Sequence, residues 1–192
     1  IGVRMSLSKD EQRRVLATEV FSRCCLVGEF TLRSGRTANR YFDKYQFESD
    51  PELLAALAAE MVALVPDDID LLAGLEMGGI PVVTALAAAT GIPAVFVRKV
   101  AKEYGTARLA EGPSVAGKRV LIVEDVVTSG GQIRLSAADL RDIGALVVGA
   151  VCVIDREEGG SEILAEDGIV LSSLFGAAEL EAVGATYRPS WG

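Results

Sequence analysis

The chain contains no histidine among its 192 residues. Histidine is the base of Ser-His-Asp and Cys-His sites and a frequent zinc ligand, so nucleophilic hydrolases of those types and histidine-dependent zinc hydrolases are excluded. A histidine general base is excluded as well. The chemistry of an active site must therefore come from carboxylates, lysines, arginines, a metal ion or the backbone.

Cysteine is also scarce, with three residues, Cys24, Cys25 and Cys152. The adjacent pair cannot easily form a disulfide, and the chain has no Cys-x-x-Cys or metal-ligand spacing. We predict reduced thiols that fill the core. Charged and polar residues follow soon after Ile1, so no secretory signal is apparent, and the cytoplasm is the expected location.

Positive charge is in deficit, because 19 Lys and Arg residues stand against 27 Asp and Glu residues, for a net charge of −8. This balance disfavours non-specific binding to nucleic acid and docking on an anionic membrane. We therefore expect no nucleic-acid or membrane partner. Any anion site must rest on local positive charge.

Long hydrophobic runs are few. Residues 77–97 carry no charge, which is long enough to raise the question of a membrane helix. Gly91-Ile92-Pro93 interrupts the run. The pattern instead predicts a buried helix at about residues 81–90, a turn, and a short buried strand at residues 94–97.

The remaining pattern indicates one domain spanning residues 1–192, since 50% of the residues are hydrophobic. Ser8 and Glu11 form a capping-box signature for an N-terminal helix, and a small hairpin is expected around residues 30–43. We assign about residues 1–48 to this helix and hairpin and about residues 49–192 to an α/β core. Strands that alternate with helices predict a mainly parallel sheet flanked by helices. Strands are expected at residues 71–74, 94–97, 119–123, 146–154 and 169–172, and helices at about 51–64, 81–90, 133–143 and 175–183.

The most informative segment is residues 120–132. Four branched apolar residues are typical of a buried strand, Glu124 and Asp125 follow them, and a hydroxyl- and glycine-rich loop precedes a helix with apolar residues at Ile133, Leu135, Ala138, Leu140 and Ile143. Open α/β sheets bind ligands at this end of a strand. The loop can cradle a phosphate with backbone N–H groups, and the two acids, if they face solvent, can accept hydrogen bonds from two sugar hydroxyls.

This segment resembles the phosphoribosyl diphosphate (PRPP) signature of type I phosphoribosyltransferases. The chain has no G-x-x-x-x-G-K-[ST] motif, and an ordinary strand-turn-helix corner does not need two acids facing solvent. The resemblance implies the type I phosphoribosyltransferase fold and a catalytic role for Asp125. It also implies that PRPP is bound by Glu124, Asp125, Val126, Val127, Thr128, Ser129, Gly130, Gly131 and Gln132.

A second glycine-containing turn, residues 74–81, follows another expected strand. It resembles the pyrophosphate-binding loop of orotate phosphoribosyltransferases, which assigns Glu76, Met77, Gly78 and Gly79 to PRPP binding. Some members carry a Tyr-Lys pair where this chain has Met77 and Gly78, so the backbone amides would contact the ligand here. Taken alone, the segment is an unremarkable glycine turn.

A third segment, residues 98–112, concentrates positive charge at Arg98, Lys99 and Lys102. Its charge alone favours a solvated loop, but its sequence resembles the Arg-Lys-x-x-Lys-x-x-Gly loop of orotate phosphoribosyltransferases. The resemblance implies that these three residues and Tyr104 bind PRPP, and that Lys99 and Lys102 are catalytic. In the family this loop closes over the neighbouring subunit's active site, which implies a homodimer with shared sites.

The orotate site is the last part that the resemblance implies. Asp155-Arg156-Glu157-Glu158-Gly159 matches the family's Asp-Arg-x-x-Gly pattern, whose arginine holds the carboxylate of orotate. From the residues alone, Arg156 could equally form a surface ion pair with Glu157 or Glu158. The hairpin resembles the family's hood over the base, although other members have lysine where Arg33 stands. Orotate is thus expected to contact Thr128, Arg156, Arg33 and Phe42.

The resemblance therefore implies transfer of phosphoribosyl from PRPP to orotate, which gives orotidine 5′-monophosphate and pyrophosphate in the biosynthesis of UMP. Mg²⁺ is expected as cofactor, held mainly through PRPP rather than by protein ligands. Two alternatives remain open at this stage. One is a type I phosphoribosyltransferase for another base, and the other is a non-catalytic regulator that senses PRPP with the same fold.

Overall fold

The computed structural model describes residues 8–31, 35, 37–99 and 109–186, and the remaining residues lie outside the part described below. A six-stranded sheet forms its centre, in the order β5-β4-β3-β6-β7-β8. β5 runs antiparallel to β4, and all other neighbouring strands are parallel, which confirms the expected mainly parallel sheet. The strands are β3 (Leu71–Leu75), β4 (Ala94–Val97), β5 (Ala110–Glu111), β6 (Arg119–Val127), β7 (Leu146–Asp155) and β8 (Leu171–Gly176).

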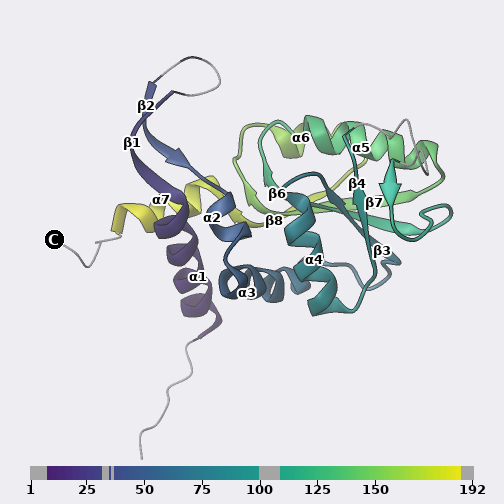
Figure 1. The fold of residues 1–192 in the computed structure, drawn as a ribbon, viewed down its shortest axis with the longest axis horizontal. Helices are drawn as coiled ribbons and strands as arrows, with labels where there is room; N and C mark the ends of the chain where they lie inside the picture. Colours follow the sequence, from purple (N-terminus) through teal and green to yellow (C-terminus); the bar gives the residue numbers. More distant parts are fainter. Residues whose placement is uncertain (1–7, 32–34, 36, 100–108, 187–192) are drawn as a thin grey trace, which may run out of the picture.

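Helices cover both faces of this sheet (Figure 1). Side chains alternate between the faces along a strand, so Leu72 packs in one hydrophobic cluster while Leu71 and Ala73 pack in the other. The first cluster joins α3 (Pro51–Met61) and α4 (Gly79–Thr90) to the sheet, and the second joins α5 (Gly131–Asp142) and α6 (Gly160–Glu166). A single turn, η1 (Val62–Leu64), ends the α3 segment.

The N-terminal segment lies at one end of the sheet (Figure 1). In α1 (Lys9–Cys24), Ser8 and Glu11 form the predicted capping box. β1 (Cys25–Thr31) and β2 (Thr37–Phe42) make the expected hairpin, which stands away from the main sheet (Figure 1). α2 (Tyr45–Glu48) leads from the hairpin to α3.

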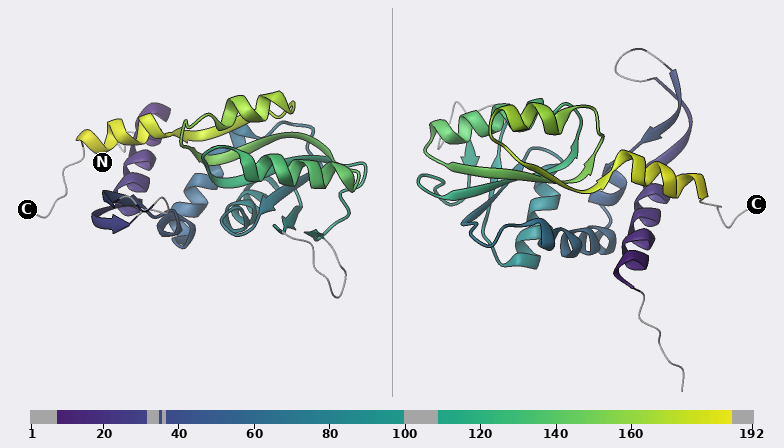
Figure 2. Two further views of the ribbon diagram at one scale, coloured as in Figure 1. Left: turned by 90° about the horizontal axis from the view of Figure 1, so that it is seen from above. Right: turned by 180° about the vertical axis from the view of Figure 1, so that it is seen from behind.

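The C-terminal helix α7 (Ala177–Thr186) lies beside α1 in both views of Figure 2. Gly184 makes this close approach possible, because a Cβ atom there would be 2.2 Å from the ring of Phe21. Ala17 and Val20 of α1 belong to the same hydrophobic cluster as the sheet residue Leu72. This shared core supports our proposal that the chain is a single domain.

The uncharged run of residues 77–97 forms α4 and β4, as predicted, and among the described residues no helix is long and apolar enough to cross a membrane. The prediction that the cysteines fill the core holds for Cys24 and Cys152, which are buried free thiols, but not for Cys25. Burial raises the pKa of the Cys24 thiol to about 12, which keeps it protonated. Cys25 is a half-buried free thiol at the start of β1.

Two details of the central segment differ from the prediction. β6 does not end at Val123 but continues to Val127, because its ladder with β7 pairs Glu124 with Cys152 and Val127 with Asp155. Asp125 is therefore 1% exposed, and the expectation that it faces solvent is wrong.

The apolar face predicted for α5 is only partly correct. Ile133 and Leu140 are buried, but Leu135 is 65% exposed and Ile143 is 44% exposed. Ser136 and Ala137 are buried instead, so the face is rotated from the one that the apolar pattern suggested. The short elements α2, α6 and β5 carried too little periodicity to be predicted, and β8 and α7 begin two residues later than expected.

Candidate active site

The loop between β6 and α5 is built by close packing of glycines. Gly130 has φ of 72° at the N-cap of α5, a conformation that favours glycine. A Cβ atom at Gly160 would lie 2.5 Å from the carbonyl oxygen of Thr128, so the loop rests directly on the start of α6. Thr128 and Ser129 remain exposed beside the first turn of α5. N–H groups at a helix N-terminus with nearby hydroxyls can bind a phosphate group.

The other residues of this segment differ in their access. Val126 is half-buried, whereas Val127 is buried and could contact a ligand only through its backbone. The carbonyl oxygen of Val127 already accepts a hydrogen bond from the Arg156 N–H at 2.8 Å. The side chain of Gln132 donates to Ser136 Oγ at 3.1 Å within α5.

The turn after β3 lies against the same acids. The peptide bond between Glu76 and Met77 is cis, and Met77 is 62% exposed. A Cβ atom at Gly78 would lie 1.6 Å from Asp125 Oδ2, and one at Gly79 would lie 2.6 Å from the carbonyl oxygen of Val123. These positions therefore require glycine, and the structure brings the predicted pyrophosphate loop and the acidic pair together.

The basic segment begins beside this turn. The Lys99 N–H donates to Glu76 Oε1 at 2.7 Å, which connects the two loops. Arg98 is half-buried, and its Nε atom lies 3.4 Å from Glu111 Oε1 in an ion pair. The Lys99 side chain is exposed. Lys102 and Tyr104 lie outside the described residues.

Three carboxyl groups and one lysine meet beneath Gly78. Asp125 Oδ2 accepts a hydrogen bond from Lys44 Nζ, and Glu48 is 8% exposed. Burial, followed by contact with Asp125, raises the pKa of Glu48 to about 8. Burial and the charge of Asp125 raise the pKa of Glu124 to about 9. Burial opposes ionisation of Asp125 too, but hydrogen bonds from Glu48 and Lys44 outweigh it and hold the pKa below the ordinary value.

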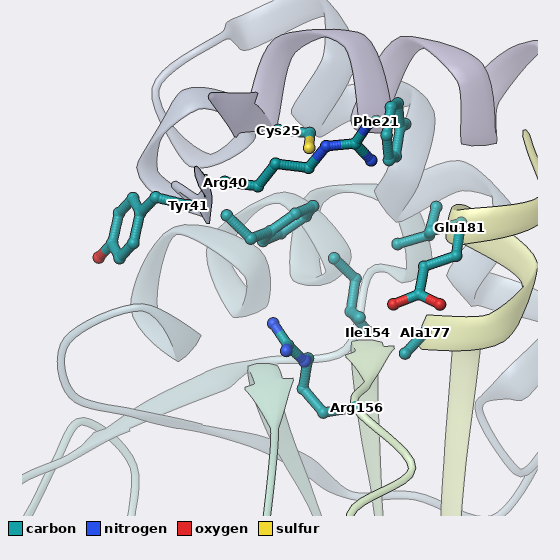
Figure 3. Close-up of a pocket in the computed structure, with 10 residues that line it drawn as sticks. Phe21, Cys25, Arg40, Tyr41, Ile154, Arg156, Ala177 and Glu181 are labelled. Atoms are coloured by element: carbon teal, nitrogen blue, oxygen red, sulfur yellow. The ribbon is translucent and has the colours of Figure 1, made fainter. Parts of the chain in front are cut away.

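Two of the four expected contacts of orotate meet at a cavity of about 410 Å³ under the hairpin, whereas Thr128 is not among its lining residues. Phe42 and Arg156 both line it, and in Figure 3 the Arg156 guanidinium points from the end of β7 into the space near Arg40 and Glu181. Arg156 also pairs with Glu158 at 3.6 Å, but both side chains are more than 40% exposed, so the pair is weak. Glu157 does not pair with it in the described structure and instead accepts from the Ala178 N–H at 2.7 Å.

Sequence reasoning assigned no role in these sites to Glu48, Arg40 and Glu181, and it grouped Lys44 with the hood without its contact to Asp125. Lys44 and Glu48 surround Asp125, and Arg40 and Glu181 line the cavity. Lys44 and Asp125 are 81 positions apart, so no local spacing could have paired them. Arg33 lies outside the described residues. Among those described, no group of three or more acidic or cysteine side chains could hold a metal ion, and hard oxygen ligands from a substrate would have to complete a Mg²⁺ site.

Comparison with known proteins agrees with this arrangement. Residues 46–183 match the family model of the phosphoribosyl transferase domain. An orotate phosphoribosyltransferase of Nocardioides sp. is 53% identical over 167 residues, which cover 87% of this chain and 93% of that protein. The counterpart from Halobacterium salinarum is 48% identical over 80% of this chain and 87% of its own length.

Solved structures show the same relationship. Orotate phosphoribosyltransferase of Mycobacterium tuberculosis with Fe(III) dicitrate has a TM-score of 0.81 and 37% identity, covering 88% of this chain and 98% of that one. The same enzyme in complex with PRPP has a TM-score of 0.76 and 34% identity, over 88% of this chain and 99% of that one. This chain belongs to the orotate phosphoribosyltransferases of the type I phosphoribosyltransferase family.

Proposed function

We propose that the protein transfers the phosphoribosyl group of PRPP to N1 of orotate, giving orotidine 5′-monophosphate and pyrophosphate on the route to UMP. The observation that carries this proposal is the position of Arg156. Its guanidinium enters the cavity under the hairpin from the end of β7, the strand next to the PRPP segment β6. A planar guanidinium suits the carboxylate of orotate, which uncharged bases lack.

The donor is supported by the loops at the ends of β3 and β6. The related enzyme of Mycobacterium tuberculosis was solved in complex with PRPP. In our proposal the 5′-phosphate binds at the first turn of α5, with the backbone and hydroxyls of residues 128–132. The pyrophosphate binds at residues 76–79, where Gly78 and Gly79 let the backbone approach closely.

The chemical step breaks a bond at an anomeric carbon, so positive charge develops on the ribose and negative charge on the leaving pyrophosphate. Glu124 and Asp125 would hold the ribose hydroxyls, and the Asp125 carboxylate, which stays ionised, would stabilise the positive charge. Arg98, Lys99, Lys102 and Tyr104 would offset the charge of the leaving group. Mg²⁺ would be held mainly by PRPP oxygens and would supply further positive charge to the pyrophosphate.

The acceptor would be held by Arg156, Arg33, Phe42 and Thr128. Orotate is already an anion at neutral pH, so the reaction needs no histidine base. The apolar walls of the cavity, which include Phe21 and Ile154, suit a flat ring. Binding and orientation of orotate by these residues would therefore account for most of their contribution to the reaction rate.

We further propose a homodimer in which Arg98 acts at the partner's active site, as the family resemblance implies. Arg98 follows β4 directly and is half-buried, which is compatible with this role. A cytoplasmic location is supported by three free cysteines, which persist in a reducing compartment.

A panel of bases tests the assignment. Purified protein with PRPP and Mg²⁺ is supplied separately with orotate, uracil, adenine and hypoxanthine, and pyrophosphate release is measured. We expect release with orotate and no more than a small fraction of that rate with the other bases. Faster release with another base would identify a different phosphoribosyltransferase, and PRPP binding without release for any base would identify a regulator. Likeness to an adenine phosphoribosyltransferase of Trypanosoma brucei, at 18% identity, reflects the fold alone.

A further inference from the structure

Glu48 is a buried acid that the proposed reaction does not use. It is the last residue of α2, immediately after the hairpin, and it is 8% exposed. Its Oε1 atom is buried and has no hydrogen-bond partner among the described residues. A buried carboxylate oxygen without a donor is costly, so this position calls for a physical reason.

The surroundings of Glu48 supply that reason. A Cβ atom at Gly78 would lie 2.9 Å from Glu48 Oε1 and 1.6 Å from Asp125 Oδ2, so both carboxyl groups face the same backbone atom. If Glu48 and Asp125 were both ionised, each would offer the other only hydrogen-bond acceptors, and no hydrogen bond could form between them. A proton on Glu48 turns the contact into a hydrogen bond donated to Asp125.

The charges around this pair favour such a proton. Asp125 and Asp43 place negative charge near Glu48, and Lys44 places positive charge there. Lys44 is committed to Asp125 Oδ2, and this hydrogen bond outweighs burial and raises the pKa of Lys44. Lys44 therefore offsets the charge of Asp125, and a proton keeps Glu48 neutral. The raised pKa of Glu124 keeps the third carboxyl group neutral as well. A side-chain hydrogen bond with Glu124 also lowers the pKa of Asp125, and Asp125 Oδ1 accepts from the Val126 N–H at 2.5 Å.

We propose that Glu48 is a positioning residue which, in its protonated form and together with Lys44, holds the Asp125 carboxylate against the pyrophosphate loop at Gly78. The cluster joins three parts of the chain that contact different portions of the substrates. Lys44 and Glu48 follow the hairpin that covers the base, Asp125 lies in the PRPP strand, and Gly78 lies in the pyrophosphate loop. It thereby couples the base-binding hairpin to the ribose-binding acid. The inference rests on the proposed function for the identity of the substrates.

The test compares Glu48→Gln with Glu48→Leu. The amide of Gln can donate the same hydrogen bond and cannot ionise, whereas Leu fills the space without a donor. We expect Glu48→Leu to lower kcat about tenfold and to raise the KM for PRPP, because small displacements of a positioned group cost large factors in rate. Glu48→Gln should keep kcat within about threefold of the wild type. Glu52→Leu, an exposed acid at the start of α3, is the matched control.

The pH profile separates positioning from a general loss of structure. The wild type should lose activity as pH rises through about 8, because Glu48 then loses its proton. In Glu48→Gln this alkaline limb should move to higher pH. Melting temperatures establish that each variant is folded at the assay temperature. If Glu48→Leu does not fold, the inference is tested by the alkaline limb of the pH profile in Glu48→Gln alone.

Wild-type kcat in Glu48→Leu, or an unmoved alkaline limb in Glu48→Gln, would overturn the inference. Failure of the proposed function would look different, since the wild type itself would then show no turnover with orotate. In that case the role of Glu48 is tested by the affinity of each variant for PRPP, measured by calorimetry. Weakened PRPP binding in Glu48→Leu with near wild-type binding in Glu48→Gln supports the cluster, and equal affinities refute it.

Discussion

At the scale of single residues, the acids of the PRPP segment differ in their surroundings although they are neighbours in sequence. Asp125 is buried against Lys44, whereas Glu124 is half-buried beside Gly79. Local sequence predicted that both residues belong to a ligand site. It could not predict their burial, because the lysine that makes burial of Asp125 tolerable comes from a distant segment.

Arg156 is the residue on which the identity of the acceptor depends. In Arg156→Ala we expect the KM for orotate to rise by about 10- to 100-fold, since hydrogen bonds to charged groups contribute about 1.5–3 kcal/mol. The KM for PRPP should change by less than about threefold. Steady-state kinetics with each substrate varied in turn measures both. Equal weakening of orotate and PRPP would remove the basis for this assignment.

The raised pKa of Glu48 also has a consequence for stability. Folding raises this pKa from 4.5 to about 8, so the folded protein binds a proton that the unfolded chain has released. The contribution of Glu48 is therefore most favourable below about pH 4.5 and declines as pH rises to about 8. Thermal melts of the wild type and Glu48→Gln should show the variant gaining relative stability over this interval. Parallel curves for the two proteins would disagree with a protonated Glu48.

At the scale of secondary structure elements, the central strands and helices could be predicted because their apolar patterns are strong. The end of β6 could not, since Glu124 and Asp125 look like the start of a loop, while the ladder with β7 extends the strand to Val127. α2 has four residues and no periodicity, and its importance follows only from the contacts of Lys44 and Glu48.

The contact between the pyrophosphate loop and β6 can be tested at Gly78. A methyl group there would lie 1.6 Å from Asp125 Oδ2, so either the loop or the carboxylate must move. We expect Gly78→Ala to lose about 1–3 kcal/mol of stability through overpacking and to lower kcat. Denaturant unfolding and steady-state kinetics measure the two effects. An unchanged midpoint with unchanged kcat would show that this packing is unimportant.

At the scale of the whole molecule, one fold brings the proposed PRPP site and the proposed orotate site together. The sheet places the proposed PRPP loops along its carboxyl edge, and the hairpin and α7 add walls to the cavity that Arg156 enters. The arrangement of the sheet followed from the alternation of strands and helices. The positions of Arg40 and Glu181 in the cavity could not be predicted. Neither residue belongs to a recognised motif, and the two line one cavity only because α1 packs on α7.

The proposed shared active site predicts that two inactive variants can complement each other. Arg98→Ala and Asp125→Asn should each have little activity alone. In mixed dimers, one of the two sites receives both intact residues if Arg98 acts across the interface, so random mixing should restore about a quarter of wild-type activity. Light scattering measures the dimer, and absence of any recovery in confirmed mixed dimers would place Arg98 in its own subunit's site.

The measurement that tests the central claim most directly is the absorbance of orotate after the protein is mixed with orotate, PRPP and Mg²⁺, with EDTA as the control. Our account predicts a loss of orotate absorbance that depends on PRPP and that EDTA abolishes, with orotidine 5′-monophosphate as the product. Unchanged absorbance with folded protein would contradict the assignment of orotate as the acceptor.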